Sequence, residues 1–210
     1  MSRTIFLLFF VTTLFANPYL CFTDEEMLYI EKTRGVIPKN RVNDYEKFMN
    51  HIRNHEKAKQ LREVNLYLNQ LLPQYDKVIR KKEDYWATPK EFLISGFGDC
   101  EDYVIIKYFS LLRLGFDEKR LFITVVKFKH SRGRHMVLSY FKNAKKYPLI
   151  LDNLSFRILP LDKRIDLKAE FFINSSGVYK ATKTYHIRKI AKSFKKYKTL
   201  MKRIEKESCK

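Results

Sequence analysis

The feature of the sequence that most constrains the fold is a series of strand-forming segments after residue 120. Leu121 to Phe128 reads LFITVVKF, a run of β-branched and aromatic residues, and predicts a strand. The loop KHSRGR leads into a second predicted strand, His135 to Phe141. KNAKKYP turns the chain into a third, Leu149 to Leu154, and FRILPL predicts a fourth. We expect these strands to form an antiparallel meander.

Helical patterns come before the meander. One runs from Asp24 to Arg34 and ends at Gly35 and Pro38. A longer one runs from Asp44 to Leu72, with apolar residues near helical spacing, and is stopped by Pro73.

The last predicted helix before the strands carries a cysteine. Gly96 and Gly98 break the chain, and Asp99 can cap a helix from Cys100 to about Leu114. The order is therefore helices, a helix bearing Cys100, and then strands, which predicts an α+β fold.

The N-terminus reads MSRTIFLLFFVTTLFANP, a short basic region followed by an apolar run and a small residue. This pattern predicts a secretory signal peptide over residues 1–16, with an uncleaved anchor as the alternative. Export places the chain in an oxidising compartment, where an odd cysteine count leaves one thiol unpaired. A pairing of Cys21 with Cys209 would leave Cys100 free, although nothing in the sequence requires that pairing.

Positive charge dominates the chain, with a formal net charge of +19. It favours acidic partners, membrane surfaces or nucleic acid, and for an exported protein nucleic acid is the weakest of these. The charge is concentrated in residues 181–210, which we expect to form a basic amphipathic helix. That helix either packs its apolar stripe on the domain, the interpretation we favour, or contacts a membrane surface.

Three residues have the types and order of a nucleophilic triad. A helix N-terminus favours the thiolate of Cys100, His135 can act as its base, and Asp152 can orient the imidazole. The order Cys–His–Asp matches papain-like and transglutaminase-like enzymes. The alternatives are a buried inert cysteine and an unrelated strand histidine.

The sequence also resembles a known family. The strings YWATPKEFLISGFGDCEDYVIIKYFSLLRLGF, HMVLSY, LDNL and DLKAEFFINSSGVY resemble the bacterial transglutaminase-like cysteine proteases of the LapG type. The resemblance covers about Tyr85 to Tyr179. It implies a protease domain over residues 17–180, with N-terminal helices in 24–72 and a catalytic core in 85–180. That core would be papain-like or transglutaminase-like, its nucleophile helix packed on an antiparallel sheet.

The resemblance implies a periplasmic cysteine endopeptidase that cuts a large surface adhesin near its N-terminus and so disperses a biofilm. Carried over by position, Cys100 is the nucleophile, His135 the base and then the acid, and Asp152 the orienting carboxylate. Family members require calcium, and an inner-membrane receptor for cyclic di-GMP holds them inactive.

The resemblance places calcium on Asp99 and Glu101, with Asp102 as an additional ligand. Ligand chemistry agrees, because carboxylate oxygens suit Ca²⁺ and a lone cysteine argues against structural zinc. A cation would also offset the repulsion between these acids and a Cys100 thiolate. The alternative is a cap at Asp99 followed by favourable first-turn acids.

Two further questions stay open from the sequence alone. Trp86 lines the cleft, donates its indole N–H to an oxyanion, or anchors the core. The chain could also be a transglutaminase-type acyl transferase or a non-enzymatic, calcium-stabilised binding module.

Overall fold

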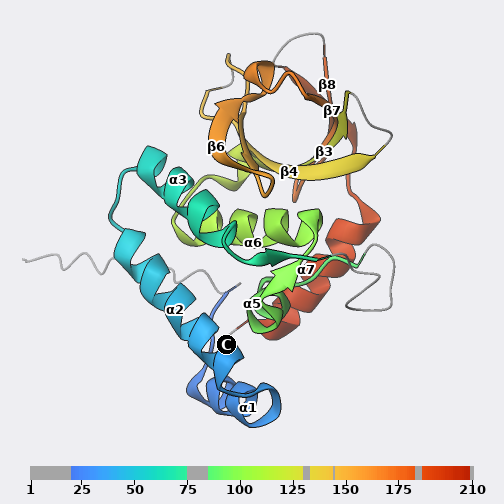
Figure 1. Cartoon of the computed structure of the whole chain (residues 1–210). Coiled ribbons are helices and arrows are strands. Elements are labelled where there is room, and N and C mark those ends of the chain that lie inside the picture. Colours follow the sequence, from blue (N-terminus) through green and yellow to red (C-terminus); the bar gives the residue numbers. More distant parts are fainter. Residues whose placement is uncertain (1–19, 75–84, 130–132, 144, 183–185, 209–210) are drawn as a thin grey trace, which may run out of the picture.

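The computed structural model describes residues 20–74, 85–129, 133–143, 145–182 and 186–208 of the chain. Helices pack against a curled seven-stranded antiparallel sheet, and Figure 1 shows α6 running alongside it. This arrangement confirms the predicted α+β class. None of the described helices is long and apolar enough to cross a membrane. The predicted signal peptide, residues 1–16, lies outside the described residues.

Three helices open the described part of the chain: α1 (Asp24–Arg34), α2 (Val36–Ile52) and α3 (Lys57–Leu68). The first was predicted with these bounds. The single helix predicted from Asp44 to Leu72 is wrong, because the chain breaks after Ile52. The Gln60 side chain donates hydrogen bonds to the Ile52 and Arg53 carbonyls at 3.0 and 2.8 Å, which satisfies carbonyls at the end of α2.

A short helix, α5 (Pro89–Ser95), leads to the cysteine. Thr88 and Glu91 form a capping box at its start, and Gly96 ends it in the left-handed region with φ 79°. Two short strands, β1 (Leu72–Pro73) and β2 (Phe97–Gly98), then pair in parallel. The chain enters α6 (Cys100–Arg113) directly after β2, as the glycine pattern predicted.

The large sheet has the strand order β6-β5-β4-β3-β7-β8-β9. The four predicted strands are confirmed, although three more that the sequence did not predict complete the sheet. Short 3₁₀ helices at Glu118–Arg120 and Leu161–Lys163 precede β3 and β7. In chain order the strands are β3 (Leu121–Phe128), β4 (Arg134–Tyr140), β5 (Leu149–Asp152), β6 (Ser155–Pro160), β7 (Leu167–Asn174), β8 (Gly177–Ala181) and β9 (Ile187–Ala191).

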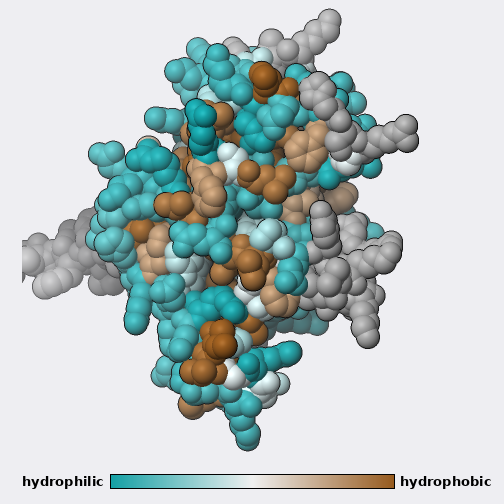
Figure 2. Space-filling view, viewed as in Figure 1, coloured by the Kyte–Doolittle hydropathy of each residue, from teal (hydrophilic) through white to brown (hydrophobic). Residues whose placement is uncertain are grey.

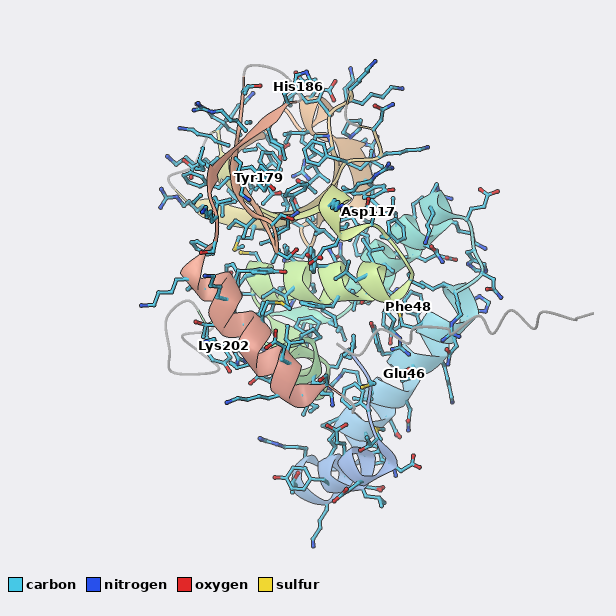
Figure 3. The ribbon with its side chains drawn as sticks, turned by 180° about the vertical axis from the view of Figure 1, so that it is seen from behind. Glu46, Phe48, Asp117, Tyr179, His186 and Lys202 are labelled. Atoms are coloured by element: carbon cyan, nitrogen blue, oxygen red, sulfur yellow. The ribbon has the colours of Figure 1, made fainter. Side chains whose placement is uncertain are left out.

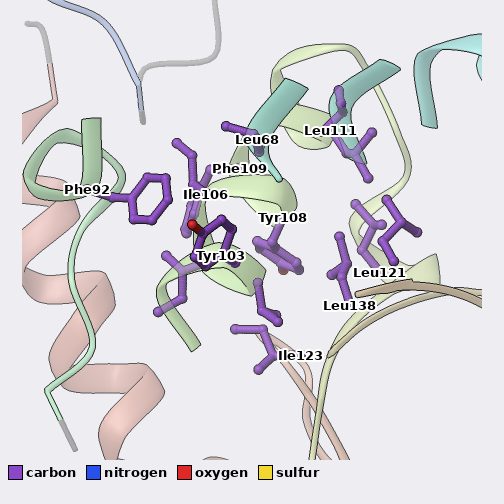
Figure 4. Close-up of a cluster of buried hydrophobic side chains, with 14 of the residues drawn as sticks. Leu68, Phe92, Tyr103, Ile106, Tyr108, Phe109, Leu111, Leu121, Ile123 and Leu138 are labelled. Carbon is purple, nitrogen blue, oxygen red and sulfur yellow. The ribbon is translucent and has the colours of Figure 1, made fainter. Parts of the chain in front are cut away.

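The main core lies between α6 and one face of this sheet. Ile106 and Leu111 of α6 are fully buried, in one cluster with Ile123 and Leu138 of the strands (Figure 4). Burying each such side chain stabilises the fold by roughly 1.5–3 kcal/mol. On the other face of the sheet Val137 belongs to a separate small cluster. Alternation along β4 therefore places His135 on the Val137 face.

The C-terminal segment differs from the prediction. A single basic amphipathic helix was expected over residues 181–210, but Ile187–Ala191 pairs with β8 as edge strand β9. The helix itself, α7 (Lys195–Glu207), begins later. Its Tyr197, Leu200 and Ile204 are buried, which confirms that the apolar stripe packs on the domain.

The polar side of α7 faces solvent. Figure 3 labels Lys202, an exposed side chain on this helix. Across the face shown in Figure 2, hydrophilic side chains predominate and apolar residues form separate patches.

The cysteines agree in part with the prediction. Cys21 is disulfide-bonded, whereas Cys100 is a free thiol. Cys209, whose pairing with Cys21 the sequence left open, lies outside the described residues.

Candidate active site

Cys100 is the first residue of α6, so its thiol lies at the positive end of the helix dipole. Asp99 occupies the N-cap position as predicted, but its side chain makes no capping hydrogen bond. The predicted position of the N-cap is therefore confirmed, but the side-chain hydrogen bond expected of a capping aspartate is not formed.

The surroundings of the Cys100 thiol favour its neutral form. Sγ donates a hydrogen bond to Glu101 Oε2 at 3.2 Å. Burial, followed by the negative charge of Glu101, raises the pKa of the thiol, while a hydrogen bond from the Met136 backbone N–H acts in the opposite direction. Met136 is next to His135 on β4, so the thiol meets the strand that carries the candidate base.

His135 and Asp152 lie on neighbouring strands, β4 and β5, and are hydrogen-bonded to each other. The distance from His135 Nε2 to Asp152 Oδ1 is 2.7 Å, and the side chains are 5% and 0% exposed. The Phe128 ring stacks on the imidazole, with 5.2 Å between centroids and 17° between planes. Because Nε2 is engaged by the carboxylate, Nδ1 is the ring atom available to a nucleophile.

Asp152 is held in its ionised form. Burial would raise its pKa, but hydrogen bonds from His135, the Leu154 N–H and Arg164 outweigh burial and lower the pKa to about 2. Arg164 Nη2 lies 2.9 Å from Asp152 Oδ2 and 2.7 Å from Asp166 Oδ2. Sequence reasoning missed Arg164, since nothing in its local pattern points back to a carboxylate twelve residues earlier.

This lowered pKa predicts how acid will affect folding. Since the folded-state pKa is depressed, the stabilisation is present above the ordinary pKa of 3.8 and is lost as pH falls towards about 2. Urea unfolding should show a loss of about 2 kcal/mol from this group over that range. Asp152→Asn should lack this component, and the exposed Asp162→Asn should keep it. If the free energy of unfolding fell equally with pH in wild type and in Asp152→Asn, the lowered pKa of Asp152 would be contradicted.

A cavity of about 660 Å³ opens at this place. Cys100 and His135 both line it, while apolar side chains such as Val125 and Phe171 form part of its wall. Trp86 lines it as well, and is 6% exposed with an indole N–H that has no hydrogen-bond partner among the described residues. The C-terminal segment contributes Phe194 and Lys196.

The acids around Cys100 have different environments. Asp102 is buried, and its Oδ1 accepts a hydrogen bond from the Ala87 N–H at 2.7 Å. Burial raises the pKa of Glu101, while hydrogen bonds that include one with Asp99 lower it. In the part of the chain that the structure describes, no three His, Cys, Asp or Glu side chains form a group that could hold a metal ion. The predicted set Asp99, Glu101 and Asp102 stays a prediction.

The fold and this site define a class: a mixed helix and antiparallel sheet protein of transglutaminase-like type, with a free cysteine at a helix start. The chain belongs to the family of bacterial transglutaminase-like cysteine proteinases, whose family model matches residues 38–165. No curated protein matches the chain.

Solved structures give the same assignment. Calcium-bound LapG of Legionella pneumophila is 32% identical, with a TM-score of 0.73 over 85% of this chain and 98% of that one. EGTA-treated LapG from the same organism is also 32% identical and has a TM-score of 0.72, over 85% and 97% of the two chains. The chain is therefore a cysteine proteinase of the LapG type.

Proposed function

We propose that this chain is an exported, calcium-dependent cysteine endopeptidase of the periplasm that cuts a large surface adhesin near its N-terminus. The cut would release the adhesin and promote biofilm dispersal. The observation that carries the proposal is the cavity lined by the free thiol of Cys100 and by His135, with His135 bonded to buried Asp152. The similarity to LapG, known in calcium-bound and EGTA-treated forms, supports the calcium requirement.

The proposed chemistry is acyl transfer to Cys100 followed by hydrolysis. Sγ attacks the scissile carbonyl carbon and its proton passes to His135 Nδ1. As the C–N bond breaks, Nδ1 gives this proton to the leaving amine, and a thioester remains on Cys100. His135 then takes a proton from a water molecule whose oxygen attacks the thioester carbonyl carbon. As the C–S bond breaks, Nδ1 returns this proton to the Cys100 sulfur and the carboxylic acid product leaves. Throughout, Asp152 keeps a proton on Nε2, which selects the neutral tautomer with Nδ1 free and stabilises the imidazolium that forms when Nδ1 is protonated.

Calcium fits the acids beside the nucleophile in this proposal. Asp99 and Glu101 would hold the ion, with Asp102 as an additional ligand, because carboxylate oxygens are hard donors. Burial already disfavours the charged form of Glu101, so an uncompensated carboxylate there is unfavourable. A bound cation supplies positive charge that offsets the repulsion between these acids and a thiolate.

The proposal extends to partners. A cyclic di-GMP receptor in the inner membrane is proposed as the inhibitor, and nucleic acid is not proposed as a partner. A peripheral membrane contact through α7 would depend on its lysines, because Tyr197, Leu200 and Ile204 are already buried. Exposed Lys202 is one such side chain.

The function is tested with N-terminal fragments of large adhesins from the same genome, incubated with the purified protein with and without Ca²⁺. We expect one cut that appears only with Ca²⁺. Incorporation of a labelled amine in place of hydrolysis would identify an acyl transferase instead. Absence of both products, with every fragment tried, would leave a binding module as the better account.

A further inference from the structure

A group of polar side chains, Asn65 and Lys107 buried and Asn69 half-buried, lies next to the Asp152 backbone and has none of the roles assigned above. Asn65 of α3 and Asn69, which caps the C-terminal end of that helix, are far from residues 152–156 in sequence, but they contact the segment that joins β5 to β6. Asn69 Nδ2 donates to the carbonyl oxygens of Asp152 and Ser155 at 2.8 and 3.1 Å. Asn65 Nδ2 donates to the Ser155 carbonyl at 3.0 Å. Since carbonyl oxygens only accept, these contacts fix the orientation of both amides.

Lys107 completes this group from the nucleophile helix. It is 0% exposed, and its Nζ donates to Asn65 Oδ1 at 2.8 Å. It lies two helical turns after Cys100, so one rigid helix carries both side chains. The contacts thus join the helix of the nucleophile to the turn of the orienting carboxylate through α3.

The charge of Lys107 is not needed for packing. A lysine fully removed from water is unfavourable, and an apolar side chain of similar length would fill the same space at lower cost. The groups that face it are Asn65 of α3, the Tyr103 ring of α6 at 5.9 Å, and the negative charge of Asp152. Burial lowers the pKa of Lys107 to about 7, and Asp152 opposes that change.

We infer that Asn65, Asn69 and Lys107 are positioning residues that hold Asp152 against His135. Arg164 and the Leu154 N–H fix the carboxylate, whereas Asn69 fixes the backbone carbonyl of the same residue. Lys107 fixes Asn65 and, when it is protonated, adds positive charge near the carboxylate. The inference rests on the proposed roles of His135 and Asp152, but it does not depend on the identity of the substrate.

The test uses Asn69→Ala, Lys107→Met and a matched control in the full-length mature protein. Gln60→Ala is the control. Gln60 lies on α3, as Asn65 does, and is 1% exposed. Its side chain also donates to two backbone carbonyls, but these are at the end of α2 and not beside Asp152. Two readouts need no substrate: the downfield proton NMR signal of the His135 Nε2–H bonded to Asp152, and the rate of Cys100 alkylation by iodoacetamide with Ca²⁺ present.

We expect the NMR signal to broaden or shift upfield in Asn69→Ala and Lys107→Met. We expect alkylation to slow by roughly tenfold to a hundredfold, the range that a displacement of about 1 Å produces. With a cleavable peptide the loss should appear in kcat and not in KM. Gln60→Ala should match wild type in all readouts, and Lys107→Arg should restore part of the rate.

Wild-type NMR signals and alkylation rates in folded Asn69→Ala and Lys107→Met would overturn the inference. Equal losses in Gln60→Ala would also overturn it, because the effect would then be general to α3. Lys107→Met keeps the volume of the side chain, so it remains informative if Asn69→Ala does not fold. If wild type cleaves no peptide, the proposed function fails while the NMR readout still decides this inference.

Discussion

Replacing Cys100 with alanine is expected to reduce cleavage below detection, a loss on the order of a millionfold. Among the described residues that line the cavity, Cys100 is the cysteine, and it shares the cavity with His135, which is hydrogen-bonded to Asp152. Cleavage of an adhesin fragment, followed by gel electrophoresis and mass spectrometry, measures the loss.

Two controls separate loss of the nucleophile from loss of the fold. The thermal midpoint of Cys100→Ala should stay near that of wild type, because the change removes one sulfur with its hydrogen bonds to Glu101 and from the Met136 backbone N–H. His135→Ala should also abolish cleavage, whereas His51→Ala, on the exposed side of α2, should not change it. Cleavage by folded Cys100→Ala would show that the nucleophile is assigned to the wrong residue.

Removal of calcium is expected to abolish cleavage, and its return to restore it. Without a cation, Glu101 accepts a hydrogen bond from the Cys100 thiol, and the negative charges of the neighbouring acids disfavour a thiolate. The measurement is cleavage in EGTA, then after excess Ca²⁺, with Mg²⁺ as the comparison ion. Mg²⁺ should fail to restore activity, because it demands near-octahedral geometry and retains its water.

Substitutions of the proposed ligands test whether the calcium requirement arises from Asp99 and Glu101. Asp99→Asn and Glu101→Gln should each raise the Ca²⁺ concentration needed for half-maximal activity, whereas exposed Asp162→Asn should not. Isothermal titration with Ca²⁺ measures the affinities directly. Undiminished cleavage after thorough chelation would contradict the calcium requirement.

Much of the fold could be predicted because its signals are local. The glycines before Cys100 and the apolar stripe after it define α6, and β-branched residues define β3. The break between α2 and α3 was missed, because it depends on Gln60 reaching back to the carbonyls at the end of α2. Strand β9 was read as helix, since its few apolar residues fit helical spacing and only pairing with β8 makes it a strand.

The candidate site shows the same limit. Cys100, His135 and Asp152 could be selected by type and order, and the structure brings His135 and Asp152 into contact. Arg164 and Asn69 could not, because an arginine or an asparagine has no pattern until the fold places it beside Asp152. The residues that hold a site in place come from distant segments, and sequence spacing does not reveal them.

The most direct test of the account is the reactivity of Cys100 towards iodoacetamide at pH 7, with and without Ca²⁺. Cys100 is the free thiol of the described residues, so mass spectrometry of its peptide follows one site. The account predicts fast alkylation with Ca²⁺, slow alkylation in EGTA, and slow alkylation in His135→Ala under both conditions. Equal rates for the wild type with and without calcium would contradict it.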